Sequence, residues 1–257
     1  MKPNHLRTTL VLVSSVAQRY LMELTLTNLR TGALGFMLAA ATTGAWAQRN
    51  LNPGIFPPTS HPYGLTNTEW SIRWLQWGAS IPADENPFLD PDGRFCHVGQ
   101  SGTVFFLGNN FGGSVVRSCT VPPGKSLYIP PGGAFCILGA DATTVAGLQA
   151  CVDESIAGIT NVSADIDGVP VQDISRYLLK TPLFTLTLPT DNIFGLPPGD
   201  YQTLAAGWTL ILKPLPPGQH VIHFHDEFSP FVFDVTYLIT VDPGLQSNGS
   251  QRPAHVF

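Results

Sequence analysis

Two histidines and a glutamate alternate near the C-terminal end of the sequence, at His223, His225 and Glu227. Alternate residues of a β-strand point to the same face, so an extended segment here would place the three side chains side by side. Imidazoles and a carboxylate suit zinc, iron or copper, and such a set leaves open positions for water or oxygen chemistry. The pattern therefore predicts a candidate site for a divalent transition metal, although the sequence as a whole requires no cofactor. A polar outer face of an ordinary strand and metal-free acid–base chemistry are the two competing interpretations.

The segments around these residues have the pattern of a β-sheet. From Phe231 to Val241 apolar residues alternate with more polar ones, which is typical of a strand with one buried face. In the segment 220–228 the face opposite the candidate ligands is mainly apolar, so we expect it to face a core. His220 belongs to this inward face and is expected to be a hydrogen-bonded core histidine. The prolines and the glycine at 214–218 mark a turn or an edge crossing before this strand.

Three tryptophans lie at helical spacing in the first half of the chain. Thr66 offers an N-cap, Trp70, Trp74 and Trp77 follow on one helical face, and Pro82 ends the helix. We interpret the stripe as the surface that packs the helix onto a sheet. The alternative is that the three indoles form a ligand-binding platform on which a sugar could stack.

The four cysteines all follow residue 47. An even number of cysteines in an exported chain indicates two disulfides, and three connectivities are open. We favour Cys96–Cys119 and Cys136–Cys151, because each pair flanks one compact unit. A second helix is predicted over 141–157, beside the last of these cysteines.

Composition favours short strands over long helices. The 257 residues are 44% hydrophobic and only 12% charged, and they include 25 glycines and 23 prolines. Many short strands joined by tight turns fit this mixture. The sequence therefore predicts an all-β protein: an antiparallel β-sandwich, with a jelly roll as one arrangement, covered by one or two short helices.

The first 47 residues have the features of an export signal. Arg30 precedes the apolar core Ala33–Ala41, and the small-x-small sequence Ala45–Ala47 follows as a cleavage site. Residues 1–21 are interpreted as an over-long start. The apolar run is shorter than the roughly 20 residues that span a bilayer, so no membrane span is expected after cleavage.

The remaining residues, 48–257, are predicted to form a single β-sandwich domain. Of the 13 basic and 18 acidic residues, four basic and one acidic residue lie in the signal segment. The mature chain thus has nine basic against seventeen acidic residues, a net charge of −8. An acidic chain without a basic cluster argues against nucleic acid and anionic lipid as partners.

Several motifs resemble a family of exported bacterial proteins that combine a signal peptide, a tryptophan-rich helix and a cysteine-containing β-domain. The similarity covers nearly all of the mature chain and implies a shared fold, but no assigned chemistry. It rests on the Trp-x-x-x-Trp-x-x-Trp pattern, Gly99–Gly102, Val104–Leu107, Asp167–Val171, Leu212–Leu215, the Gly218-x-His220-x-Ile222-x-Phe224 pattern and Asp234–Tyr237.

These observations predict a secreted or periplasmic soluble protein that binds a small molecule, a glycan or a protein. The alternative is a metal-dependent enzyme, a hydrolase or an oxidoreductase, that uses His223, His225 and Glu227. The sequence contains neither a Gly-x-Ser-x-Gly nucleophile elbow nor a phosphate-cradling loop. It leaves open whether the protein catalyses any reaction and what its oligomeric state is.

Overall fold

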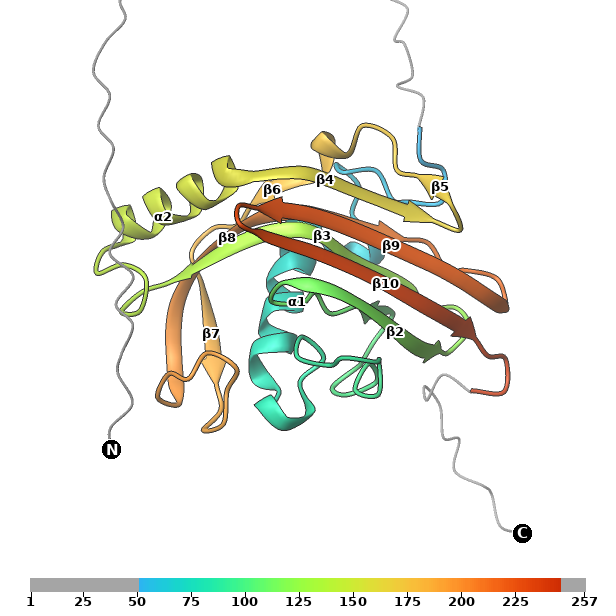
Figure 1. Cartoon of the computed structure of the whole chain (residues 1–257), viewed down its shortest axis with the longest axis horizontal. Coiled ribbons are helices and arrows are strands. Elements are labelled where there is room, and N and C mark those ends of the chain that lie inside the picture. Colours follow the sequence, from blue (N-terminus) through green and yellow to red (C-terminus); the bar gives the residue numbers. More distant parts are fainter. Residues whose placement is uncertain (1–50, 246–257) are drawn as a thin grey trace, which may run out of the picture. The chain divides into compact units, whose positions relative to one another are not determined.

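The computed structural model describes residues 51–245, which fall in one compact unit. The predicted signal peptide, 1–47, lies outside the described residues. Two five-stranded β-sheets pack face to face in this unit, and two α-helices flank them (Figure 1). The prediction of an all-β sandwich with short covering helices is confirmed.

The first sheet, called sheet A below, has the order β1-β3-β8-β6, with β7 pairing with the first half of β8. The second, sheet B, has the order β2-β10-β9-β4-β5. The strands of sheet A are β1 (Val104–Phe106), β3 (Ser126–Ile137), β6 (Leu178–Lys180), β7 (Phe184–Leu188) and β8 (Gly199–Leu212). Those of sheet B are β2 (Gly113–Val121), β4 (Ile159–Ile166), β5 (Val169–Pro170), β9 (Gly218–Phe228) and β10 (Phe231–Val241).

Both sheets are mixed: most strand pairs are antiparallel, as predicted, and two pairs are parallel. β1 runs parallel to β3, and β2 runs parallel to β10. The second pairing brings together strands that are far apart in the sequence. Parallel neighbours need a crossover connection instead of a hairpin, and here the chain between β2 and β10 passes through strands of both sheets.

The main core lies between the two sheets. It is built from the inward rows of β3 and β8 on one side and of β9 and β10 on the other, as their alternating sequence predicts. Its members include Leu127, Ile129, Leu210, Leu212, Ile222, Phe224, Val235, Tyr237 and Ile239, all of which are at most 3% exposed.

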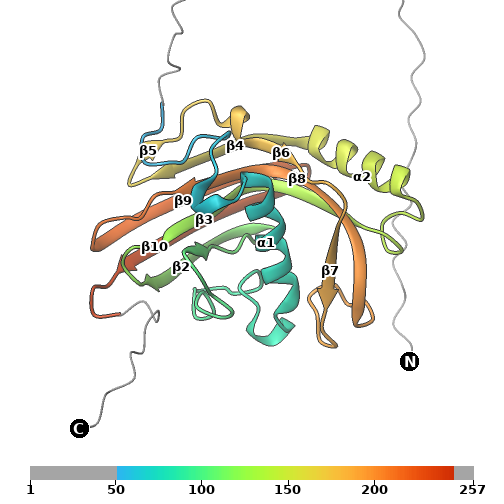
Figure 2. The ribbon, with the colours of Figure 1, turned by 180° about the vertical axis from the view of Figure 1, so that it is seen from behind.

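The helix α1 (Asn67–Ser80) follows the predicted start signal closely. The Thr66 hydroxyl accepts from the Glu69 amide at 3.1 Å, and the Glu69 carboxylate accepts from the Thr66 amide at 2.7 Å, which completes a capping box. The helix lies on the outer face of sheet A, as the turned view shows (Figure 2).

The second helix, α2 (Val145–Gly158), begins later than the predicted residue 141. Thr144 caps it by accepting from the Gly147 amide at 3.0 Å, while the Asp141 carboxylate accepts from the Ile137 amide at 2.7 Å and belongs to the preceding turn. Three short 3₁₀ segments complete the helical content: Pro62–Gly64, Ala83–Glu85 and Ile174–Tyr177.

The strand β3 continues through Pro130 and Pro131, although two prolines in succession usually end a strand. It continues to Ile137 and pairs with β8 on both sides of a register shift between Ile129 and Gly132. The two prolines have no amide hydrogen and sit within this shift, where the ladder is already interrupted. The prolines therefore mark an irregularity inside one long strand and not its end.

Both predicted disulfides are present. Cys96 is bonded to Cys119, and Cys136 on β3 is bonded to Cys151 on α2. Disulfides form and persist in oxidising compartments, so the covalent structure agrees with a protein made for such an environment. Among the described residues, no helix has the length and apolar character that crossing a membrane would need.

Candidate functional site

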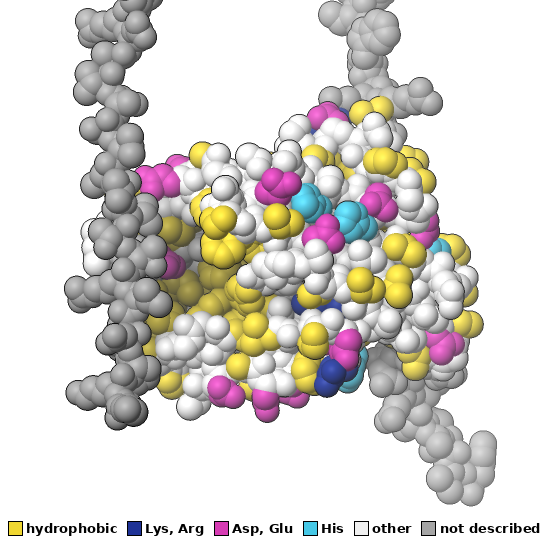
Figure 3. All heavy atoms as spheres, in the orientation of Figure 1, with side chains coloured by type: hydrophobic (Ala, Val, Ile, Leu, Met, Phe, Trp, Pro, Cys, Tyr) yellow, Lys and Arg dark blue, Asp and Glu magenta, His cyan; other side chains and the backbone are white. Residues whose placement is uncertain are grey.

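The structure brings His223, His225 and Glu227 to the same outer face of β9, as the alternation predicts. Two further carboxylates lie beside them, Asp165 on β4 and Asp234 on β10, because these strands pair with β9 on either side. We call these five residues the His–carboxylate ladder. Figure 3 shows histidine and acidic side chains gathered on one face of the molecule, over sheet B.

Every imidazole nitrogen in the ladder faces a carboxylate oxygen. His223 Nδ1 lies 3.0 Å from Asp165 Oδ2, and His223 Nε2 lies 3.1 Å from Asp234 Oδ2. The same Asp234 oxygen lies 3.1 Å from His225 Nδ1, and His225 Nε2 lies 3.2 Å from Glu227 Oε1. The ladder is therefore an alternating row of potential positive and negative charges.

The ladder shifts the pKa values of His223 and Asp234 toward their charged forms. Burial by itself lowers the pKa of His223, but its contacts with Asp234 and Asp165 outweigh burial and raise it above the usual range. Burial by itself raises the pKa of Asp234. The hydrogen bonds with both histidines outweigh burial, so the pKa is lower than usual. Charged imidazole is thus favoured beside charged carboxylate.

Metal binding by these residues stays a prediction. Within residues 51–245, no group of three or more His, Cys, Asp or Glu side chains has an arrangement that could hold a metal ion. The ring nitrogens of His223 and His225 contact carboxylates along a row, whereas metal ligands converge on one point about 2 Å away. Zinc, iron and copper analysis of the purified protein, compared with the His223→Ala/His225→Ala variant, tests the hypothesis directly.

The three tryptophans of α1 face the sheet. Their indole N–H groups donate to main-chain carbonyls: Trp70 to Pro62 and Trp77 to Val98, both at 2.9 Å, and Trp74 to Leu107 at 2.8 Å. Trp70 and Trp77 are buried among other aromatic rings, so the geometry supports the packing interpretation. Contact of Trp70 or Trp77 with a ligand remains a prediction, whereas half-buried Trp74 lines the cavity described next.

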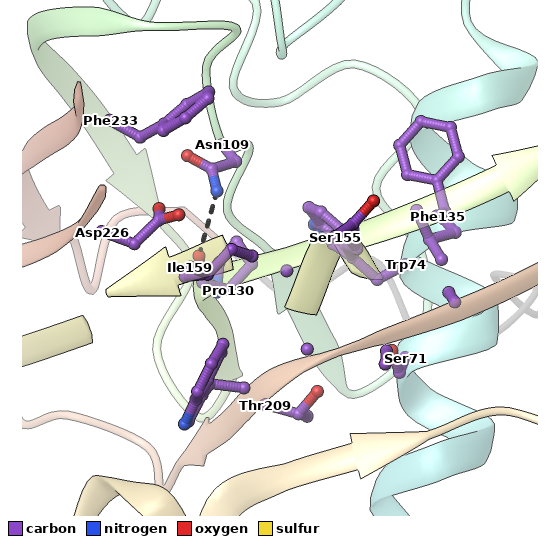
Figure 4. Close-up of a pocket in the computed structure, with 18 of the residues that line it drawn as sticks. Ser71, Trp74, Asn109, Pro130, Phe135, Ser155, Ile159, Thr209, Asp226 and Phe233 are labelled. Carbon is purple, nitrogen blue, oxygen red and sulfur yellow. Dashed lines mark hydrogen bonds between the residues drawn. The ribbon is translucent and has the colours of Figure 1, made fainter. Parts of the chain in front are cut away.

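A cavity of about 290 Å³ opens beside the middle of β3. Its walls come from α1, the loop 109–111, β3, β8, the junction of α2 with β4, and the hairpin of β9 and β10. Figure 3 shows this face hollowed and lined by hydrophobic side chains. Figure 4 places Asp226, Asn109 and Phe233 together at one end of the cavity, with Trp74 and Phe135 toward the other.

On the inner face of sheet A, the cavity lies between the part that packs against α2 and the part that packs against sheet B. Along the inner row of β8, Leu204 and Ala206 pack with α2, while Leu210 and Leu212 pack with sheet B. Trp208 lies between these pairs and lines the cavity. The cavity is therefore a gap between two well-packed cores.

Glycines let the two strands beside the gap approach each other closely. A Cβ at Gly133 would lie 2.9 Å from the Ala206 carbonyl oxygen, and one at Gly207 would lie 2.8 Å from the Gly132 carbonyl oxygen. Only glycine lets β3 and β8 approach this closely. Sequence reasoning missed this feature, although the runs Gly132–Ala134 and Ala205–Gly207 were its signal.

Asp226 brings a carboxyl group into this apolar setting. It lies on the inward face of β9 after Ile222 and Phe224, is 4% exposed, and has no hydrogen-bond partner among the described residues. A Cβ on Gly132 would lie 3.2 Å from its Oδ2, so the two strands meet closely here. Burial raises the pKa of Asp226 to about 7, and the charge of His225 on the other face of β9 acts in the opposite direction.

A buried arginine fixes the loops beside the cavity. Arg117 of β2 is 1% exposed and donates to the carbonyl oxygens of Asp90, Gly108 and Asn109 at 2.7, 2.8 and 3.1 Å. It also donates to the Tyr237 hydroxyl at 3.0 Å. The backbone at residues 108 and 109 is therefore held in place by contacts within the protein.

The comparisons with known proteins assign no family. No known protein family matches the sequence, and no curated protein matches it. One solved structure, described as "Structure of PbICP-C in complex with falcipain-2", aligns with 55% of this chain and all of its own at 15% identity. Its TM-score of 0.21 is too low to support a shared fold or function. The resemblance to exported bacterial proteins therefore stays a prediction.

Proposed function

We propose that this protein is a secreted or periplasmic binding protein that takes a small, largely apolar molecule into the cavity beside β3. The observation that carries the proposal is an apolar gap that is built into the fold and contains one buried, unpaired carboxyl group. Ligand sites in proteins are typically concave, apolar and supplied with few polar groups. Core packing does not account for Asp226, because a buried charge without a partner is costly.

The size of the cavity limits the ligand. A cavity of roughly 150 Å³ holds a benzene-sized guest, so a volume of about 290 Å³ suits a compact molecule with two fused rings. A glycan fits this lining less well, since its many hydroxyl groups would meet mostly aromatic and aliphatic side chains. Binding without catalysis is favoured, because no nucleophile or second acid–base group is paired with Asp226 among the described residues of the cavity.

Calorimetric titration with naphthylethanol tests the proposal. Ser155 on α2 lines the cavity and is half-buried, so the Ser155→Phe variant should place a ring in the binding space. Ala157 lies on the same helix, is exposed and is absent from the cavity wall, which makes Ala157→Phe the matched control.

We expect saturable binding of one probe per protein for the wild type and Ala157→Phe. Ser155→Phe should bind at least about ten times more weakly, which corresponds to 1.4 kcal/mol. The proposal is overturned if the wild type binds neither naphthylethanol nor the related naphthylethylamine. Equal binding by the wild type and Ser155→Phe would also overturn it, because the probe would then occupy another place.

A further inference from the structure

Two hydrogen-bond acceptors at the cavity lack donors. The Asp226 carboxyl group is one of them. The second is Oδ1 of Asn110, a residue that also lines the cavity, is 9% exposed, and has this oxygen buried without a partner. The Nδ2 group of the same asparagine is already used, because it donates to the Gly113 carbonyl oxygen at 2.8 Å. Buried polar groups in proteins are normally paired, so two unpaired acceptors at one cavity indicate a missing donor.

The polar side chains of the wall offer little to an anionic ligand. Asn109 donates to the Pro130 carbonyl oxygen at 3.3 Å, and Ser155 donates to the Cys151 carbonyl oxygen at 2.8 Å. The Thr209 hydroxyl is paired with the hydroxyl of Tyr128 at 3.0 Å. The Trp208 indole N–H is the side-chain donor left without a partner among the described lining residues, and it carries no charge.

We propose that the cavity selects a ligand whose flat apolar body carries one protonated nitrogen, which binds the Asp226 carboxylate. This inference rests on the proposed function and adds the chemical class of the ligand. An ammonium group supplies several N–H donors and a positive charge, and charge-assisted hydrogen bonds are about twice as strong as neutral ones. The aromatic face of Phe233, which lies at the same end of the cavity as Asp226, also attracts a cation.

The surroundings of Asp226 favour this pairing over its alternatives. The charged side chain that acts on it is His225, which lies on the opposite face of β9 and is itself held between Asp234 and Glu227. No lysine or arginine lines the cavity among the described residues. A carboxylate ligand would therefore meet a like charge in an apolar setting, and a neutral alcohol would gain a single ordinary hydrogen bond.

Three matched probes test the ligand class by calorimetry at pH 8: naphthylethylamine, naphthylethanol and naphthylacetate. For the wild type we expect the amine to bind at least about ten times more tightly than the alcohol, and the acetate to bind most weakly. Asp226→Asn keeps the shape of the side chain and removes the charge. In this variant the amine and the alcohol should bind within about threefold of each other, and the acetate should gain affinity.

Equal affinity of the wild type for amine and alcohol would overturn the inference, as would an amine preference that survives Asp226→Asn. Either result leaves the proposed function standing, provided that the alcohol still binds and Ser155→Phe blocks it. Absence of binding by both probes overturns the proposed function instead, so the two failures can be told apart. Thermal unfolding of Asp226→Asn shows in the same preparation that the variant is folded.

Discussion

Replacing Asp226 by asparagine should make the folded protein more stable at neutral and alkaline pH. The folded-state pKa of this carboxyl group is about 7, against an ordinary value of 3.8. A raised pKa means that the folded protein binds more protons than the unfolded chain between about pH 4 and pH 7, so its free energy of unfolding falls as pH rises through this range. Asparagine has the same shape and cannot ionise, so it removes this loss.

The size of the effect follows from the pKa difference. About three pKa units at 1.36 kcal/mol each give roughly 4 kcal/mol of destabilisation that is fully developed above pH 7 and nearly absent below pH 4. For a domain of this size, about 4 kcal/mol corresponds to roughly 10 °C in the midpoint of thermal unfolding. We therefore expect Asp226→Asn to melt about 10 °C above the wild type at pH 8 and close to it at pH 4.

The measurement is a series of urea and thermal unfolding curves from pH 4 to pH 8, followed by circular dichroism. Asp84→Asn is the control, because Asp84 is exposed and lies in the 3₁₀ segment Ala83–Glu85, outside both sheets. The stability of this variant should stay close to that of the wild type at every pH. A variant of Asp226 that is equally or less stable than the wild type at pH 8 would refute the reasoning. Such a result would mean that Asp226 is solvated, or paired, in the folded protein.

Three further predictions concern the scaffold. Arg117→Met should lower the free energy of unfolding by more than about 3 kcal/mol in urea titrations, because several buried carbonyl groups lose a charged donor together. In proton NMR titrations His223 should have a pKa above 6.5 that decreases in Asp234→Asn; its contribution to stability is present at acidic pH and lost as pH rises through that raised pKa. Replacing Cys136 and Cys151 by serine opens a link across 15 residues and should cost about 3 kcal/mol, measured by thermal unfolding against the oxidised wild type.

Strict alternation made β9 and β10 predictable. The segment 231–241 shows two clean rows, and the structure gives the strand the same bounds. The shared face of His223, His225 and Glu227 follows from the same period. The flanking carboxylates Asp165 and Asp234 could not be assigned to this row from the sequence, because only the register of β4 and β10 against β9 places them there.

The length of β3 depends on its pairing with β8, which the sequence of β3 alone does not reveal. Pro130 and Pro131 by themselves indicate the end of a strand, since proline cannot donate to a ladder. Pairing with β8 continues beyond them, because the register shift absorbs both prolines. The cavity was hidden for a related reason: Asp226 and Gly132 come from different sheets, and neither residue shows by itself that it faces the other.

The alternation of β9 also connects its two faces. His225 points outward into the His–carboxylate ladder, and Asp226, the next residue, points inward into the cavity. A positive charge on the imidazole favours the ionised form of Asp226, so the ladder opposes part of the burial that would keep this carboxyl group neutral. The outward row, for which a metal site is one of three interpretations from the sequence, then has a consequence that needs no metal. It favours the charged form of the carboxylate to which we propose that an ammonium ligand binds. Separate roles for adjacent residues are a direct result of the two-residue period of a strand.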